Sequence, residues 1–466
     1  MKNRLSFKLQ LQPILVFGSA YVFYLLLNLH QLRTWHLSGD DLYSLSGRIL
    51  SLNSFLSAFT NFSGQYRPLT YLLFNLYHLL MPRVMLIWLL HGLWLSLIAS
   101  LLFYLLLPTR SLSFKERSAY FVLSLSVLLS PIFYYHAYTI SSLANLLIAV
   151  IFLIELLYFK FFDQFQSFWH HGLFFTLALS TLFIKETFFI PLAVFLLAWF
   201  LLKKARKSRL LFLVGGALIF VVYFLLRVNL YQVTDSNYSY VFSFSKFKEN
   251  SLSLFAWFIN YPRGWAYGAP NRFMPWQALI SLSQLGVFVT ASSLAFLKFR
   301  QKLLIYLFLL LLSLSPYLFL NRILVYYLDI AFLLLLLILG LALDSLFLQR
   351  KILWGWGMIG LWMLLLVSNL WFIKPQWLRH SFVARANQAV DSYLKQVSDP
   401  NLNSVCILNH RRGAWGTENG LAVVHYYPQR KIQVISLKEK QPTKACLNSD
   451  LVLFNDAWSY KRRLGT

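Results

Sequence analysis

The sequence predicts an all-α polytopic membrane protein with about eleven transmembrane helices and a small C-terminal extracytoplasmic α/β domain. Three observations lead to this fold class. Hydrophobic residues make up 58% of the 466 residues and charged residues only 12%, which leaves too little polar surface for a water-soluble globule. Long apolar runs recur along the chain. Lys and Arg gather in some of the breaks between these runs.

The apolar runs define the predicted helices, because about 20 apolar residues cross the hydrocarbon of a bilayer. In chain order the runs cover 13–29, 84–107, 118–135, 139–159, 170–184, 187–202, 210–229, 277–297, 303–320, 323–347 and 352–373. The stretch 68–80 has only about 13 residues, so a surface or re-entrant helix is expected there. No small-residue cleavage site follows the first run, which is therefore expected to remain as a span.

The basic residues predict the sidedness, since short loops rich in Lys and Arg stay in the cytoplasm. With 68–80 left out of the count, the basic clusters all fall on one side. They are Lys2, Arg4 and Lys8; Arg110, Lys115 and Arg117; Lys203, Lys204, Arg206, Lys207 and Arg209; Lys298, Arg300 and Lys302; and Arg350 and Lys351. The N-terminus is then cytoplasmic, and the loops 30–83 and 230–276 and the C-terminus are extracytoplasmic. The net charge of +26 reflects membrane topology, with membrane lipids and no nucleic acid as partners, and a bacterial plasma membrane is the expected location.

The polar segment 374–466 predicts a small mixed α/β domain after the membrane domain 1–373. A helix is expected over "SFVARANQAVDSYLKQV" and strands over "SVCIL", "KIQVISL" and "DLVLF". The only two cysteines, Cys406 and Cys446, lie in this segment. They can form a disulfide if the segment faces an oxidising compartment, but a count of two does not decide this.

Two adjacent carboxylates stand in the first predicted outer loop, in a chain with only 16 acidic residues. Asp40 and Asp41 follow Ser38 and Gly39, a polar turn from which a carboxylate can project into a cavity at membrane level. The alternative is that both acids cap the N-terminus of the next helix, where the helix dipole favours negative charge. Ionisable groups at a membrane are costly, so their gathering on one side favours a functional site there.

Basic side chains are predicted on the same outer side. Arg67, before Pro68, can hold a phosphate by paired hydrogen bonds or anchor at lipid headgroups. In "STLFIKETFFIPL", Lys185 and Glu186 interrupt two apolar runs; they can compensate each other, or Lys185 can neutralise a lipid-linked phosphate. Arg263 lies in the loop "NYPRGWAYGAPNRFMPW", whose aromatic residues can line a sugar or lipid groove or form an interfacial belt.

Five motifs in this order resemble the GT-C fold membrane glycosyltransferases, most of all the protein O-mannosyltransferase group and its tetratricopeptide-carrying relatives. The motifs are "GDDLYSLSGR", "YRPLTYLLFNLYHLL", "LLHGLWLSLIASLLFYLL", "SPIFYYHAYTISSLANLL" and "FIKETFFIPLAVFLL". The resemblance covers residues 10–200 by motif order and the rest by topology. It departs from relatives that carry His, Glu, Arg and Asp where Phe133, Tyr135, Leu143 and Asn145 stand here, and no tetratricopeptide array follows.

The resemblance implies an inverting transfer of a sugar from a polyprenyl-phosphate-linked donor to an extracytoplasmic acceptor. It implies Asp41 as the general base and Asp40 in a neighbouring or metal-facing role, and whether a divalent metal is needed stays open. Six further residues are predicted in the site because they lie on the same outer side. Arg67, Lys185 and Arg263 are expected to bind the donor phosphate. Glu186, His136 and Tyr66 are expected to support the site as polar groups.

Two other classes of function remain open. A transporter or flippase of lipid-linked saccharides would use Lys185 and Glu186 in a substrate pathway. Such transporters often show related halves and interrupted helices near the midplane, and neither is clear in this sequence. A non-catalytic membrane scaffold would use its outer tail to bind a partner. The acidic pair in an outer loop favours surface chemistry and hence the glycosyltransferase.

Overall fold

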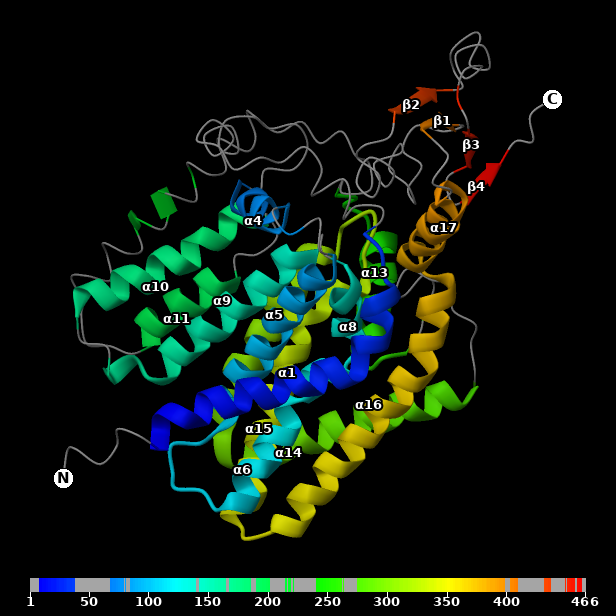
Figure 1. Ribbon diagram of the computed structural model, residues 1–466. Coiled ribbons are helices and arrows are strands. Elements are labelled where there is room, and N and C mark those ends of the chain that lie inside the picture. Colours follow the sequence, from blue (N-terminus) through cyan, green and yellow to red (C-terminus); the bar gives the residue numbers. More distant parts are fainter. Residues whose placement is uncertain are drawn as a thin grey trace.

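The computed structural model describes residues 8–37, 68–78, 80, 84–139, 142–164, 167–185, 190–201, 214–215, 217–218, 221, 240–261, 263, 275–398, 403–409, 431–436, 449, 451–456 and 459–462. Within them the fold is mostly helical (Figure 1). By length and composition, six of the described helices could cross a membrane. They are α1 (Lys8–Thr34), α5 (Val84–Leu106), α9 (Leu143–Lys160), α14 (Pro275–Leu314), α15 (Asp329–Leu348) and α16 (Ile352–His380). This agrees with the predicted multi-pass membrane protein, and the number of about eleven spans stays a prediction.

The predicted run 118–135 is a bent helix pair and not one straight helix. It comprises α6 (Phe114–Ser124), α7 (Ser126–Leu129), α8 (Pro131–Tyr134) and the 3-10 helix η1 (Tyr135–Tyr138), and the two parts are bent by 50°. The break falls at Ser130, whose backbone is extended (φ −72°, ψ 129°). A residue before proline is driven out of the helical region, so Pro131 explains the bend.

The remaining described helices are short. They are α4 (Pro68–His78), α10 (Phe168–Ser180), α11 (Ile190–Leu201), α13 (Phe244–Phe258), α17 (Phe382–Val397) and the 3-10 helices η3 (Phe162–Gln164), η4 (Thr181–Phe183), η7 (Ser315–Tyr317) and η8 (Val325–Leu328). The 11 residues of α4 extend over only about 16 Å, which confirms that this stretch is a short helix. The Thr70 hydroxyl of α4 donates a hydrogen bond to the Ile184 carbonyl at 2.7 Å. The predicted run 210–229 lies mostly outside the described residues.

The helix α14 consists of two arms joined at Phe299, whose backbone angles (φ −130°, ψ 35°) are not helical. The ring of Trp276, at the start of α14, packs on Phe372 of α16, and Tyr317, just after α14, stacks on Tyr327 with ring centroids 4.4 Å apart. A straight helix would place its two ends roughly 60 Å apart. Here both ends contact the same end of the neighbouring helices, so the chain turns back at Phe299. The predicted runs 277–297 and 303–320 correspond to the two arms.

At one end of the bundle, the C-terminal ends of α1 and α16 lie beside the N-terminal end of α5. Trp35, just after α1, stacks on Trp377 of α16 at 5.7 Å, and its indole N–H donates to the Tyr138 carbonyl at 3.2 Å. The indole N–H of Trp88 in α5 donates to the Trp35 carbonyl at 3.2 Å, and the Tyr138 hydroxyl donates to the Asn28 side-chain oxygen at 2.7 Å. We call this the loop end, because the first predicted outer loop starts here.

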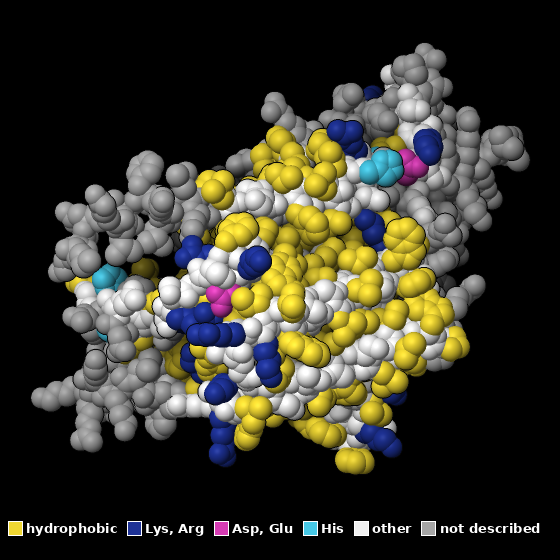
Figure 2. Space-filling model, turned by 90° about the horizontal axis from the view of Figure 1, so that it is seen from below, with side chains coloured by type: hydrophobic (Ala, Val, Ile, Leu, Met, Phe, Trp, Pro, Cys, Tyr) yellow, Lys and Arg dark blue, Asp and Glu magenta, His cyan; other side chains and the backbone are white. Residues whose placement is uncertain are grey.

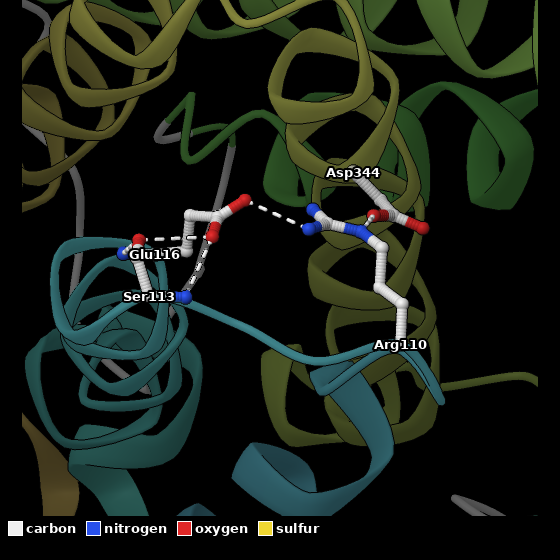
Figure 3. Close-up of polar contacts among 4 residues, drawn as sticks. All are labelled: Arg110, Ser113, Glu116 and Asp344. Atoms are coloured by element: carbon white, nitrogen blue, oxygen red, sulfur yellow. Dashed lines mark hydrogen bonds and ion pairs between the residues drawn. The ribbon is translucent and has the colours of Figure 1, made fainter.

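The opposite end, which we call the basic end, carries an ion network between α5, α6 and α15 (Figure 3). The Arg110 guanidinium lies 2.9 Å from a Glu116 oxygen and 3.1 Å from an Asp344 oxygen. Glu116 also accepts from the backbone N–H of Ser113 at 2.8 Å and so completes a capping box at the start of α6. The Lys160 ammonium donates to three carbonyls at the end of α5. Figure 2, seen from below, shows broad hydrophobic areas and a group of Lys and Arg side chains around an acidic one.

The C-terminal segment contains the predicted helix and strands. After α17 come β1 (Ser404–Asn409), β2 (Lys431–Ser436), β3 (Leu451–Asp456) and β4 (Ser459–Arg462), in the sheet order β2-β1-β3-β4. The strand β1 pairs in parallel with β2 and β3, and β4 adds antiparallel to β3. Figure 1 shows α17 and the sheet beyond the loop end of α16. The helix α16 continues to His380, so the predicted domain boundary at 374 falls inside it.

Candidate functional site

A group of four buried polar side chains lies at the loop end, where η1, α9, η4 and α15 meet. His136 comes from η1, Asn145 from the first turn of α9, Lys185 from the residues after η4, and Asp329 from the first residue of α15. All four are buried. We call these four residues the polar cluster.

Hydrogen bonds and charges connect the four side chains. The His136 Nε2 atom lies 2.8 Å from the Asp329 Oδ2 atom, and the Lys185 ammonium donates to the Asn145 side-chain oxygen at 2.7 Å. The Lys185 ammonium also acts on the Asp329 carboxyl group through its charge. The Lys185 ammonium sits 5.1 Å from the centre of the Tyr327 ring, over its face. The ammonium and the carboxylate are thus held in one connected network.

Local sequence explains why these four residues meet. Pro131 bends the α6–η1 helix pair, so the chain from α6 ends in η1 beside the start of α15. Asp329 occupies the first turn of α15, where the helix dipole favours a negative charge. Lys185 ends the segment that follows α10, and Thr70 of α4 binds the residue before it. One polar side chain of the cluster therefore comes from each of four segments that meet at the loop end.

Burial makes this arrangement costly unless the charges are paired. A charged group taken out of water loses several kcal/mol of solvation, and only close partners recover it. Lys185 and Asp329 carry opposite charges, and the His136 imidazole contacts the Asp329 carboxyl group. The polar cluster can therefore stay neutral overall.

The start of the first predicted outer loop is fastened beside the polar cluster. The Trp35 indole N–H donates to the carbonyl of Tyr138, two residues after His136. Leu37, two residues after Trp35, is buried. His36 faces α17: its backbone N–H donates to the Asn387 side chain at 2.7 Å. Burial lowers the pKa of the His36 imidazole, against the opposing effect of the Asp391 carboxylate 3.5 Å away.

No protein-family model and no characterised protein matches this chain. What the site can do is therefore argued from its residues and their geometry.

The structure brings together two of the predicted site residues, Lys185 and His136. Arg263 is exposed, its backbone carbonyl accepts the Trp257 indole N–H at 3.0 Å, and within the described residues it makes no hydrogen bond or ion pair with the polar cluster. Five further predicted residues lie outside the described residues: Asp40, Asp41, Tyr66, Arg67 and Glu186.

Sequence reasoning missed Asp329 as a site residue. A signal was present, because acidic residues inside apolar spans are rare and Asp329 falls within the predicted run 323–347. Its partner His136 is 193 residues away, so only the packed fold shows the pair. Among the described residues there is no group of three metal-ligating side chains. The metal-facing role of Asp40 therefore stays a prediction.

Proposed function

We propose that this protein is a membrane glycosyltransferase of the GT-C type, with about eleven spans, that uses a polyprenyl-phosphate-linked sugar. The acceptor is an extracytoplasmic hydroxyl group, and the active site lies at the loop end. The carrying observation is that the start of the loop bearing the acidic pair and the buried Lys185 network meet at one segment, η1. The reaction needs a carboxylate and a positive charge side by side.

In the proposed reaction Asp41 takes the proton of the acceptor hydroxyl. The acceptor oxygen then forms a bond to the anomeric carbon while the bond from that carbon to the phosphate oxygen breaks, and the configuration inverts. The lipid phosphate leaves with the electron pair of the broken bond. Lys185 would stabilise the phosphate, since positive charge is favourable where negative charge develops. Arg67 and Arg263 are further candidates for the phosphate.

The C-terminal segment supports the proposed sidedness. Cys406 is disulfide-bonded, and Cys446 is the only other cysteine of the chain. Disulfides persist in oxidising compartments and are rare in the cytoplasm. A tail in the oxidising compartment agrees with the proposal that the loop end is outside and the basic end, with Arg110 and Lys160, is in the cytoplasm, as the distribution of positive charge predicts.

The test is donor consumption by the purified protein in lipid, with a panel of radiolabelled polyprenyl-phosphate sugars and candidate acceptors. Asp41→Asn should abolish transfer while the protein still inserts and elutes normally, because the amide cannot take the acceptor proton. Turnover of Asp40→Asn tests whether Asp40 is needed beside the general base. Glu249→Gln, at an exposed ion pair on α13, is the matched control and should keep full turnover. Wild-type turnover by a correctly inserted Asp41→Asn protein would refute the assignment.

A second function, transport of a lipid-linked saccharide, is favoured by one observation. Lys185, Asp329 and His136 are buried inside the bundle and not spread over an open surface. Ionisable groups inside a membrane bundle are typical of substrate or proton pathways. Movement of a fluorescent lipid-linked saccharide across proteoliposomes, without loss of its sugar, would support transport. Sugar transfer without such movement would support the glycosyltransferase.

A further inference from the structure

An exposed row of aromatic rings lies on α13 and the residues just before it. Phe242 and Phe244 are each 80% exposed, and Phe247 and Phe255 are also exposed. Phe244, Phe247 and Phe255 follow each other at spacings of three and eight, which places them on one side of the helix. We call these four residues the aromatic face. In water, four exposed phenylalanines on one short segment would be unfavourable, so some apolar surroundings must cover them.

Other side chains of α13 fix the helix to the bundle. Leu254, Trp257 and Phe258 are buried. The Asn250 side chain donates hydrogen bonds to three backbone carbonyls, those of Tyr317, Leu318 and Leu320, at 3.0, 3.1 and 2.8 Å. These carbonyls follow the second arm of α14, so α13 is held at the loop end, beside the end of that arm. The position of α13 relative to the bundle is therefore well defined (Figure 1).

The apolar surface continues from α14 onto the aromatic face. Along the second arm of α14, Phe308 and Leu311 are exposed, as expected for side chains that contact lipid chains. Phe319 comes next, and its ring lies 5.3 Å from that of Phe242 and 5.7 Å from that of Phe247. Between Leu311 and Phe319 the exposed polar side chain is that of Ser315, and its hydroxyl donates to the Leu312 carbonyl at 2.9 Å. The same lipid that covers α14 is then the nearest apolar material for α13.

We propose that the segment 240–258 lies in the membrane interface at the loop end and inserts its aromatic face among the lipid headgroups and the upper parts of the chains. Aromatic rings concentrate at this depth, and short helices with one apolar face lie in the plane of the interface. Lys248 is exposed on the same helix, where its ammonium group can reach lipid phosphates. The partner is thus the outer leaflet of the membrane that holds the bundle. The proposal is independent of glycosyl transfer.

The test measures how deep the aromatic face lies. The full chain is reconstituted in nanodiscs as single variants, Phe242→Cys and Phe244→Cys, each carrying an environment-sensitive fluorophore on the new thiol. Quenching is compared between lipids brominated near the headgroup, lipids brominated near the chain ends, and iodide in the water. Leu311→Cys on α14 is the lipid-facing control, and Lys395→Cys on α17, where the side chain is 75% exposed, is the aqueous control. Unsubstituted protein gives the background from the native cysteines.

We expect labels at Phe242 and Phe244 to lose roughly half or more of their emission to lipids brominated near the headgroup, and little to iodide. Quenching by iodide as strong as at Lys395, without quenching by brominated lipid, would place the face in water and overturn the proposal. Stronger quenching by bromines near the chain ends would place it inside the bilayer core and also overturn it. Protection from all three quenchers would mean that protein and not lipid covers the face, and would also overturn the proposal. If a variant fails to insert, Phe247→Cys takes its place.

Discussion

The replacement Asp329→Asn tests whether the polar cluster is held together by charge. Asn keeps the size of the side chain and one hydrogen-bonding oxygen, so the change removes little except the negative charge. Asp329 and His136 are almost completely buried, and the Lys185 ammonium interacts with the same carboxylate. Breaking a buried ion pair by removing one partner costs about 3–5 kcal/mol, because the other charge stays buried without compensation. We expect the free energy of unfolding to fall by about this amount.

The assay is reversible unfolding of the purified protein in mixed micelles with a denaturing detergent. The control is Glu249→Gln, which removes the acid of the exposed Lys246–Glu249 pair at 3.1 Å. Exposed pairs contribute about 0–1 kcal/mol, so this variant should unfold almost like the wild type. A double variant, Lys185→Met with Asp329→Leu, removes both charges. It should lose less stability than the sum of the losses of Lys185→Met alone and Asp329→Leu alone, by about 0.5–3 kcal/mol.

The result that would refute the reasoning is a loss of less than about 1 kcal/mol for Asp329→Asn, no larger than for an exposed pair. Strict additivity in the double variant would also refute it, because independent sites add and coupled charges do not. In either case the polar cluster would be a set of separately solvated groups.

Three further predictions follow from other parts of the structure. Lys185→Ala should weaken use of a lipid-phosphate donor roughly 10- to 100-fold through loss of a charge-assisted contact, whereas Lys185→Arg should retain part of it; unchanged donor dependence in steady-state kinetics would remove Lys185 from the site. Cys406→Ser should lower the stability of the C-terminal sheet by about 2–4 kcal/mol in thermal unfolding, and a reducing agent should destabilise the wild type but not this variant. His36 has a lowered pKa in the folded protein, so its neutral form favours folding: this contribution is present above the unfolded value of about 6.5 and is lost as the pH falls below it. His36→Gln should show a flatter stability profile between neutral and mildly acid pH, and an identical profile would contradict the prediction.

Much of the helical architecture could be predicted from the sequence, because apolar runs and basic loops are local signals. The stretch 68–80 was predicted as a short helix from its length alone. The helix α17 and the strands β1, β2 and β3 agree with the segments predicted for them to within two residues at each end. The bend at Pro131 could also have been predicted, since the residue before a proline leaves the helical region. The predicted run 118–135 was treated as one helix, so this local signal was not used.

The features that could not be predicted depend on contacts between distant residues. Asp329 pairs with His136 across 193 residues, and no local pattern connects them. The short strand β4 is defined by its pairing with β3 and carries little periodicity of its own. Lys185 could be selected from sequence because a charge between two apolar runs is unusual, but its partner Asn145 is known only from the fold.

The contacts that fasten the start of the first loop also have a consequence for how the protein is made. His36 bonds to Asn387, 351 residues later, and the Lys374 ammonium bonds to the Leu27 carbonyl across 347 residues. At ribosomal speeds of about 5–20 residues per second, roughly 18–70 s separate the synthesis of His36 from that of Asn387. During this time α1 and the nascent loop are already at the membrane without these partners. The contacts at the start of the first loop are therefore completed only near the end of translation. A chain interrupted before α16 keeps the hydrogen bonds that join Trp35 to Tyr138 and Trp88, but lacks those made to Asn387 and Lys374.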